Sequence, residues 1–173
     1  MSPLFVSRAT IFTAKIMASN ISYLLIMRKY LGFPPSMIFR RSTDTDLSGI
    51  EAILRDLDLW CPTVRMKDFW VAEGGGRIVA VARLEEAGSR YFLSALGVIP
   101  SFRKQGIASE LVERMARETG GEIYLYTIIP GLFERLGFEE VSAPDQLPRR
   151  EVFECDRCDP DRCVCMVRHC DVS

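Results

Sequence analysis

The sequence predicts a single α/β domain, because strand-like and helix-like runs alternate along most of the chain. Tyr91 to Val98 is an apolar, strand-like run, and the helix-period stretch Gly106 to Glu118 follows it after a short polar turn. A second strand-like run, Glu122 to Tyr126, comes directly after that helix. Alternation of this kind packs helices against a sheet. At 173 residues the chain has room for one domain with a sizeable core.

Before Tyr91 the pattern predicts a strand, a helix and a hairpin. Apolar residues recur at helical spacing after the N-cap candidates of the run Thr43 to Asp46. Gly74, Gly75 and Gly76 separate two β-rich runs, which is typical of a hairpin turn. The expected elements are a strand at Met37 to Arg41, a helix at Leu47 to Leu57, hairpin strands at Phe69 to Ala72 and Arg77 to Leu84, and, late in the chain, a short helix at Pro130 to Leu136.

The two ends of the chain differ from this central part. The first 42 residues contain no Asp or Glu, and residues 1–36 are basic. That composition is shared by transit peptides, but the predicted domain begins at Met37, which favours a translation start there. We therefore expect an extension at residues 1–36 outside the core, a domain at residues 37–153 and a Cys-rich tail at residues 154–173.

Charge and hydropathy exclude several functions. The net charge is -1, which argues against a nucleic-acid-binding protein with its basic face. The longest apolar run of the N-terminal stretch, Ile21 to Met27, is far shorter than the ~20 residues that span a bilayer. His169 is the only histidine, which disfavours histidine-based catalysis. We expect a cytoplasmic protein with no membrane and no nucleic-acid partner.

The turn between the strand at 91–98 and the helix at 106–118 predicts an anion site. The first turn of a helix has N–H groups without intrahelical partners, and the helix dipole adds partial positive charge there. Gly106 and Ala108 let a ligand approach the backbone, and Arg103 and Lys104 add full charges. This combination favours a phosphate or a diphosphate.

The same turn resembles the acetyl-CoA loop of the GNAT acetyltransferases. Arg103, Gly106 and Ala108 fill the three defining positions of that loop. The chain also has the strand and the short helix ending in Leu136-Gly137-Phe138 that the family places afterwards. The resemblance implies a GNAT fold, a mixed central sheet with helices on both faces, and acetyl-CoA as co-substrate.

The resemblance further implies which residues bind acetyl-CoA. The backbones of Leu96 and Val98 would pair with the pantetheine arm, and the Leu96 N–H would polarise the acetyl carbonyl. Gly97 between them is compatible with a β-bulge. The expected cofactor-binding residues are Leu96, Val98, Arg103, Lys104, Gln105, Gly106, Ile107, Ala108 and Ser109.

The proton-transfer groups cannot be assigned from the sequence. Many family members have a tyrosine four residues before the glycine of leucine-glycine-phenylalanine, and this chain has Phe133 there. The general acid therefore stays unassigned. Four residues are candidates for the general base, and the sequence does not choose among them: Glu73, Glu85, Glu86 and Ser94.

A narrower resemblance bears on the acceptor. Tyr126-Thr127, Phe133, Leu136-Gly137-Phe138 and Leu147-Pro148-Arg149 look like the acetyltransferase domain of N-acetylglutamate synthases. We therefore predict acetyl transfer to a primary amine, with a small amino acid such as glutamate as the small-molecule substrate. The alternative is a non-catalytic acyl-CoA sensor with a metal- or redox-responsive Cys tail. The sequence does not determine the oligomeric state, and a homodimer is compatible with it.

The tail holds five thiols within sixteen residues: Cys155, Cys158, Cys163, Cys165 and Cys170. C-x-x-C is a common half of a structural zinc site. The second pair, spaced by one residue, is less usual. Zinc, disulfides and reduced, unliganded thiols stay open, and no metal ligand is assigned.

Overall fold

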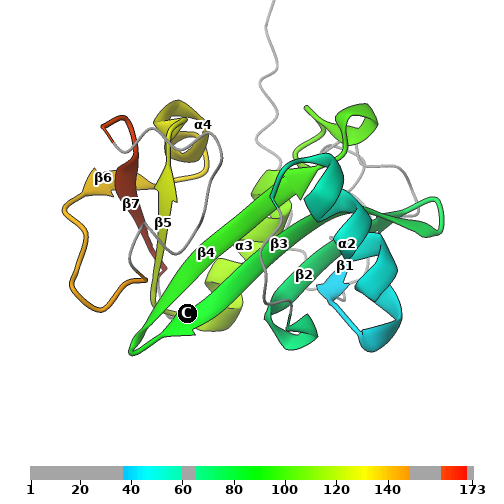
Figure 1. Ribbon diagram of the computed structural model, residues 1–173, viewed down its shortest axis with the longest axis horizontal. Coiled ribbons are helices and arrows are strands. Elements are labelled where there is room, and N and C mark those ends of the chain that lie inside the picture. The colour runs from blue at the N-terminus through cyan, green and yellow to red at the C-terminus, as the bar shows by residue number, and fades with distance from the viewer. Residues whose placement is uncertain (1–36, 60–64, 149–160, 171–173) are drawn as a thin grey trace, which may run out of the picture.

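A seven-stranded mixed sheet forms the centre of the molecule (Figure 1). The computed structural model describes residues 37–59, 65–148 and 161–170. The predictions on residues 1–36 and on Cys155 and Cys158 lie outside these ranges, and the translation start at Met37 stays a prediction. The strand order is β1-β2-β3-β4-β5-β7-β6, with β4 and β5 parallel and every other neighbouring pair antiparallel. The strands are β1 (Ile38–Arg41), β2 (Phe69–Gly74), β3 (Arg77–Ala87), β4 (Arg90–Val98), β5 (Glu122–Thr127), β6 (Glu139–Val141) and β7 (Val164–His169).

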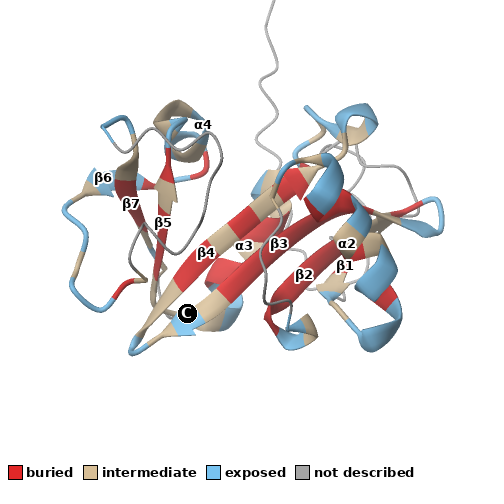
Figure 2. Ribbon diagram, in the orientation of Figure 1, coloured by how far each residue is buried: buried red, intermediate tan, exposed pale blue. Residues whose placement is uncertain are grey.

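The predicted α/β fold with helices on both faces is confirmed. Helix α3 (Ile107–Thr119) buries Ile107, Leu111 and Met115 against one face of the sheet, as their spacing predicts. Helix α2 (Leu47–Asp56) covers part of the other face through a separate apolar cluster. Helix α4 (Pro130–Glu134) follows β5, and short 3-10 turns lie at Asp44–Asp46, Met66–Asp68 and Pro100–Phe102. Figure 2 shows the buried residues concentrated along β2 to β5.

The parallel strands β4 and β5 separate soon after they begin. They pair only at Tyr91 with Ile123 and at Phe92 with Tyr124, and Figure 1 shows them diverging beyond that point. The register of β4 against β3 shifts in this region, with Ser94 as the extra residue on β4. The bulge expected at Gly97 is therefore three residues earlier, because Gly97 itself stays in register opposite Val81.

The predicted boundary between domain and tail is wrong. Residues Val164–His169 form β7, which lies between β5 and β6 and pairs with both. Cys165, Met166 and Val167 are buried there. The cysteine spacing left a metal site open. A short apolar run that contains one cysteine is, however, also typical of a buried strand.

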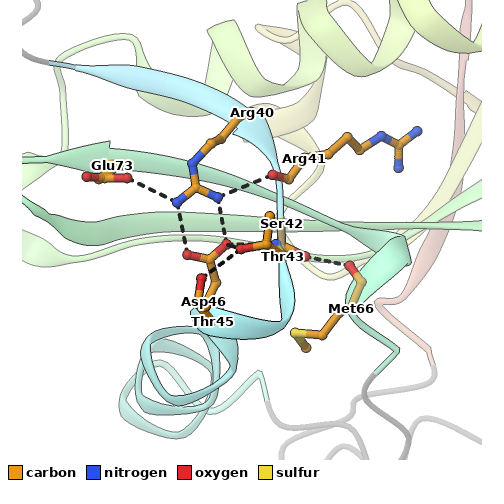
Figure 3. A network of polar contacts seen from close by, with 8 residues as sticks. All are labelled: Arg40, Arg41, Ser42, Thr43, Thr45, Asp46, Met66 and Glu73. Atoms are coloured by element: carbon orange, nitrogen blue, oxygen red, sulfur yellow. Dashed lines mark hydrogen bonds and ion pairs between the residues drawn. The ribbon is translucent and has the colours of Figure 1, made fainter.

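A charged network fastens the start of α2 to the sheet (Figure 3). Arg40 on β1 donates two hydrogen bonds to the Asp46 carboxylate, at 2.6 and 2.9 Å, and one to Glu73 on β2, at 3.0 Å. Asp46 also accepts the Thr43 N–H at 2.8 Å, which caps the turn before α2. Arg40 holds the pKa of the Asp46 carboxyl far below its usual range, mainly through these hydrogen bonds.

The sheet position of β7 predicts a large cost for truncating Met166, which is fully buried. Met166→Ala should lower the free energy of unfolding by about 2–5 kcal/mol, because it leaves a cavity in the core. Glu140→Ala, at the exposed position opposite Met166 on β6, is the control and should change it by less than about 0.5 kcal/mol. Urea titration of both variants measures this. Equal stability of the two variants would mean that β7 is no part of the core.

The lowered pKa of Asp46 predicts how stability depends on pH. The charged form is favoured in the folded state, so its contribution is complete above the unfolded pKa of about 4 and is lost as the pH falls below that value. Asp46→Asn should be less stable than wild type at pH 7, and its stability should fall less between pH 5 and pH 3. Asp44→Asn, two residues away and exposed, is the control. If the free energy of unfolding fell by the same amount between pH 5 and pH 3 in all three proteins, Asp46 would not contribute to the pH dependence of stability.

Candidate active site

The C-terminal half of β4 presents a free backbone edge to the gap between β4 and β5. The Ile99 N–H donates to Val79 O at 3.0 Å, so residue 99 faces β3. Backbone groups alternate in direction along a strand, so Gly97 also faces β3 while Leu96 and Val98 face the gap. The N–H and C=O groups of Leu96 and the N–H of Val98 are therefore in position to pair with an extended ligand, whereas Val98 O already accepts Arg103 Nε–H.

The loop after β4 turns sharply through two left-handed residues, Lys104 at φ 60° and Gly106 at φ 77°. Arg103 Nε donates to Val98 O at 3.0 Å, which holds the guanidinium beside the end of β4. Gln105 Nε2 donates to Ser101 O at 3.3 Å. A left-handed lysine is costly, because its Cβ crowds the backbone, so the loop is held by these contacts.

Helix α3 starts at this loop with unused hydrogen-bond donors. The Glu110 N–H donates to Gly106 O at 3.0 Å and makes the first turn of the helix. The N–H groups of Ile107, Ala108 and Ser109 therefore precede the intrahelical ladder. Together with the positive end of the helix dipole, these N–H groups have the arrangement that suits an anion, for which the sequence predicts a site here.

A cavity of about 660 Å³ opens between the end of β4, the start of α3 and α4. It has the volume of a small-molecule binding site. Of the nine predicted cofactor-binding residues, eight line it; Gln105 does not, because its side chain turns back to the loop. The eight are Leu96, Val98, Arg103, Lys104, Gly106, Ile107, Ala108 and Ser109.

Leu57 and Leu59, after the end of α2, form one wall that sequence reasoning missed. A Cβ on Gly97 would lie 2.8 Å from Leu57 Cδ1 and 2.7 Å from Leu59 Cδ1. The two leucines therefore lie directly against the β4 backbone, and Gly97 is the residue that allows this approach. Leu57 was predicted only as a helix residue, and Leu59 carried no signal.

The opposite wall is α4 and its flanks, of which Ile129, Leu132, Arg135 and Leu136 line the cavity. Arg168 on β7 fixes this wall: it donates to Leu136 O at 2.8 Å and to Glu113 on α3 at 2.7 Å. The ring of Phe133 packs edge-on against Phe138, with centroids 5.8 Å apart. Phe133, which is part of α4, therefore packs against Phe138, and its side chain has no acidic proton to supply. The short helix was predicted, but its cavity-lining side chains were not.

The α2 face of the sheet carries a charged cluster beside β4. Arg83, which is 5% exposed, lies 3.0 Å from Glu85 and 3.6 Å from Asp68, and Arg65 lies 2.8 Å from Asp68. The cluster pairs two guanidinium groups with two carboxylates. Arg83 stands opposite Ala95, one register position from Leu96 of the cavity.

The structure separates the four candidates for the general base. Glu73 on β2 forms an ion pair with Arg40 on β1, at the opposite edge of the sheet from β5. Glu86 is exposed. Glu85 belongs to the charged cluster. The Ser94 hydroxyl, at the bulge, is buried and has no hydrogen-bond partner within the described residues. Glu85 and Ser94 are the two that lie near the divergence of β4 and β5.

Among the described residues, no disulfide joins Cys163, Cys165 or Cys170 to another of these cysteines. Among the described residues there is no group of three or more His, Cys, Asp or Glu side chains that could hold a metal ion. Nor does this part of the chain contain a helix long and apolar enough to cross a membrane.

Comparison with known proteins identifies similar folds. The acetyltransferase (GNAT) domain model matches residues 65–140. A comparison with curated proteins found no match. The fold is similar to that of Neisseria gonorrhoeae N-acetylglutamate synthase, solved with coenzyme A and N-acetyl-glutamate, at TM-score 0.62 and 21% identity; the alignment covers 80% of this chain and 36% of that one. The chain thus spans about a third of that enzyme.

Two smaller proteins are similar over nearly their whole length. The Escherichia coli ribosomal-protein-S18-alanine N-acetyltransferase matches with TM-score 0.55 and 16% identity over 79% of this chain and 96% of its own. The PaiA N-acetyltransferase of Thermoplasma acidophilum, solved with coenzyme A, matches with TM-score 0.57 and 12% identity over 78% and 99%. With the match of residues 65–140 to the acetyltransferase (GNAT) domain model and the seven-stranded mixed sheet, these findings show that the chain has the fold of the GNAT acetyltransferases, a family whose members use acetyl-CoA as co-substrate.

Proposed function

We propose that this chain transfers the acetyl group of acetyl-CoA to the primary amine of a small amino acid. The observation that carries the proposal is the free edge of β4 beside the anion site at the start of α3. An extended pantetheine arm would pair with Leu96 and Val98, and its diphosphate would meet the N–H groups of α3.

The reaction needs few groups from the protein. The amine nitrogen attacks the thioester carbonyl, a C–N bond forms, the C–S bond breaks and CoA leaves as the thiolate. The Leu96 N–H faces the gap, where it would stabilise the negative charge that develops on the carbonyl oxygen. The amine must lose a proton, and Glu85 and the Ser94 hydroxyl are the two candidate bases that lie near the divergence of the strands.

The charged cluster supports an amino acid as acceptor. An amino acid carries one positive and one negative group. The cluster of Arg65, Asp68, Arg83 and Glu85 offers charges of both signs on β3 and on the turn before β2. Arginine binds carboxylates through two parallel hydrogen bonds. The similarity to N-acetylglutamate synthase, which was solved with N-acetyl-glutamate, points the same way.

A substrate panel tests this directly. The full chain, acetyl-CoA and glutamate, glutamine, alanine or 4-aminobutyrate are incubated, and thiol release and acetylated product are both measured. The α-amino acids should be acetylated, with kcat/KM at least 10-fold above that of 4-aminobutyrate, which lacks the α-carboxylate. Binding of acetyl-CoA without any product would instead identify a non-catalytic acyl-CoA-binding protein. Equal rates for 4-aminobutyrate would contradict recognition of the α-carboxylate.

The two left-handed glycines at the ends of α3 provide a matched test of the cofactor site. Gly106 (φ 77°) lines the cavity, whereas Gly120 (φ 58°) ends the helix away from it. Alanine at either position should cost about 1 kcal/mol of stability, because a Cβ is strained there. Only Gly106→Ala should also weaken acetyl-CoA binding, by at least about 10-fold, since its methyl group would crowd the phosphate oxygens. Calorimetric titration of acetyl-CoA into both variants measures this. Equal affinities of the two variants for acetyl-CoA would show that Gly106 is not part of the binding site.

A further inference from the structure

Three cationic side chains line the cavity, and only two of them belong to the loop before α3. Arg103 and Lys104 are neighbours in that loop. The third is Arg135, which follows α4 on the opposite wall. Neither the loop resemblance nor the helix pattern assigns a role to Arg135. A cavity with positive charge on two separate walls suits a ligand with two separate anionic groups.

Of the three cations, Arg103 alone makes a side-chain hydrogen bond within the described residues. Arg103 is held by the Val98 carbonyl, and Lys104 is fixed in a left-handed turn. Arg135 is exposed, and within the part of the chain that the structure describes no carboxylate forms an ion pair with it. Its guanidinium is thus available to an anion in the cavity.

The backbone that carries Arg135 is rigid on both sides. Arg168 donates to the carbonyl of Leu136, the next residue, and Gly137 N–H donates to Glu134 O at 3.0 Å. Phe138 N–H donates to Phe133 O at 3.0 Å, which closes the turn. A cation on a fixed turn loses little backbone freedom when it binds a ligand, which favours binding.

We propose that Arg135 binds the ribose 3′-phosphate of acetyl-CoA, while the α3 N-terminus with Arg103 and Lys104 holds the diphosphate. The inference rests on the proposed function, since it takes acetyl-CoA as the ligand. CoA carries these two anionic groups on different parts of the molecule, and the neighbouring donors of α3 suit one of them. The 3′-phosphate is a monoester with a charge close to -2 at pH 7, which a guanidinium binds through two parallel hydrogen bonds.

The test compares CoA with 3′-dephospho-CoA, which differ only in this phosphate. Both ligands are titrated calorimetrically into wild type, Arg135→Gln, Arg135→Lys and Arg117→Gln. Arg117 is the control because it is an exposed arginine on α3 that does not line the cavity. Wild type should bind CoA about 10-fold more tightly than dephospho-CoA, the preference of one charge-assisted contact.

Arg135→Gln should abolish this preference by weakening CoA alone, and Arg135→Lys should keep part of it. Arg117→Gln should change neither affinity. Equal wild-type affinity for the two ligands, or equal losses for both in Arg135→Gln, would overturn the proposal. Failure of the wild type to bind either ligand would refute the proposed function itself, so the two failures are distinguishable. Thermal melting of each variant confirms that it is folded.

Discussion

The site depends on one constraint, the early separation of the two parallel strands. After Phe92 and Tyr124, β4 and β5 no longer pair, and the backbone groups of Leu96 and Val98 face an open gap. An unpaired strand edge is costly in a protein interior unless something covers it. Here α3 begins beside the edge, and a ligand-sized cavity occupies the gap. The same geometry that exposes the edge therefore forms the cavity in which we propose that acetyl-CoA binds.

Contacts far apart in the sequence keep the gap open on both flanks. On one side, Arg40 and Asp46 fix the start of α2, and the chain after this helix places Leu57 and Leu59 against Gly97. On the other side, β7 occupies the outer edge of β5, and Arg168 links α4 to α3. Because the two walls belong to different networks, each can be altered with little direct effect on the other.

The sequence predicted the elements next to the site better than those at a distance. The strand ending at Val98, the turn through Gly106 and the following helix lie close together in the chain, so periodicity and turn chemistry identify them. The place of β7 between β5 and β6 depends on pairing across some forty residues, which no local pattern reports. The cysteines in and around that strand suggested a tail, although Cys165 is a buried strand residue.

Packing explains the remaining differences at the site. The bulge lies at Ser94 rather than Gly97, and Gly97 is needed for the approach of two leucine side chains from another element. Arg135 reaches the cavity because of where α4 packs, and exposed arginines are common enough that sequence alone gives no reason to choose it. The sequence could not predict which side chains from distant elements line the cavity, because their positions depend on tertiary packing.

The most direct measurement of the central claim is residue-resolved amide hydrogen exchange of the full chain with and without acetyl-CoA. The account predicts that the Leu96 and Val98 amides become protected when acetyl-CoA binds, because they then donate to the ligand. The Ile99 amide, already bonded to Val79 O, should be protected in both states. Binding of acetyl-CoA that leaves the exchange of Leu96 and Val98 unchanged would contradict the claim that the free edge of β4 receives the cofactor.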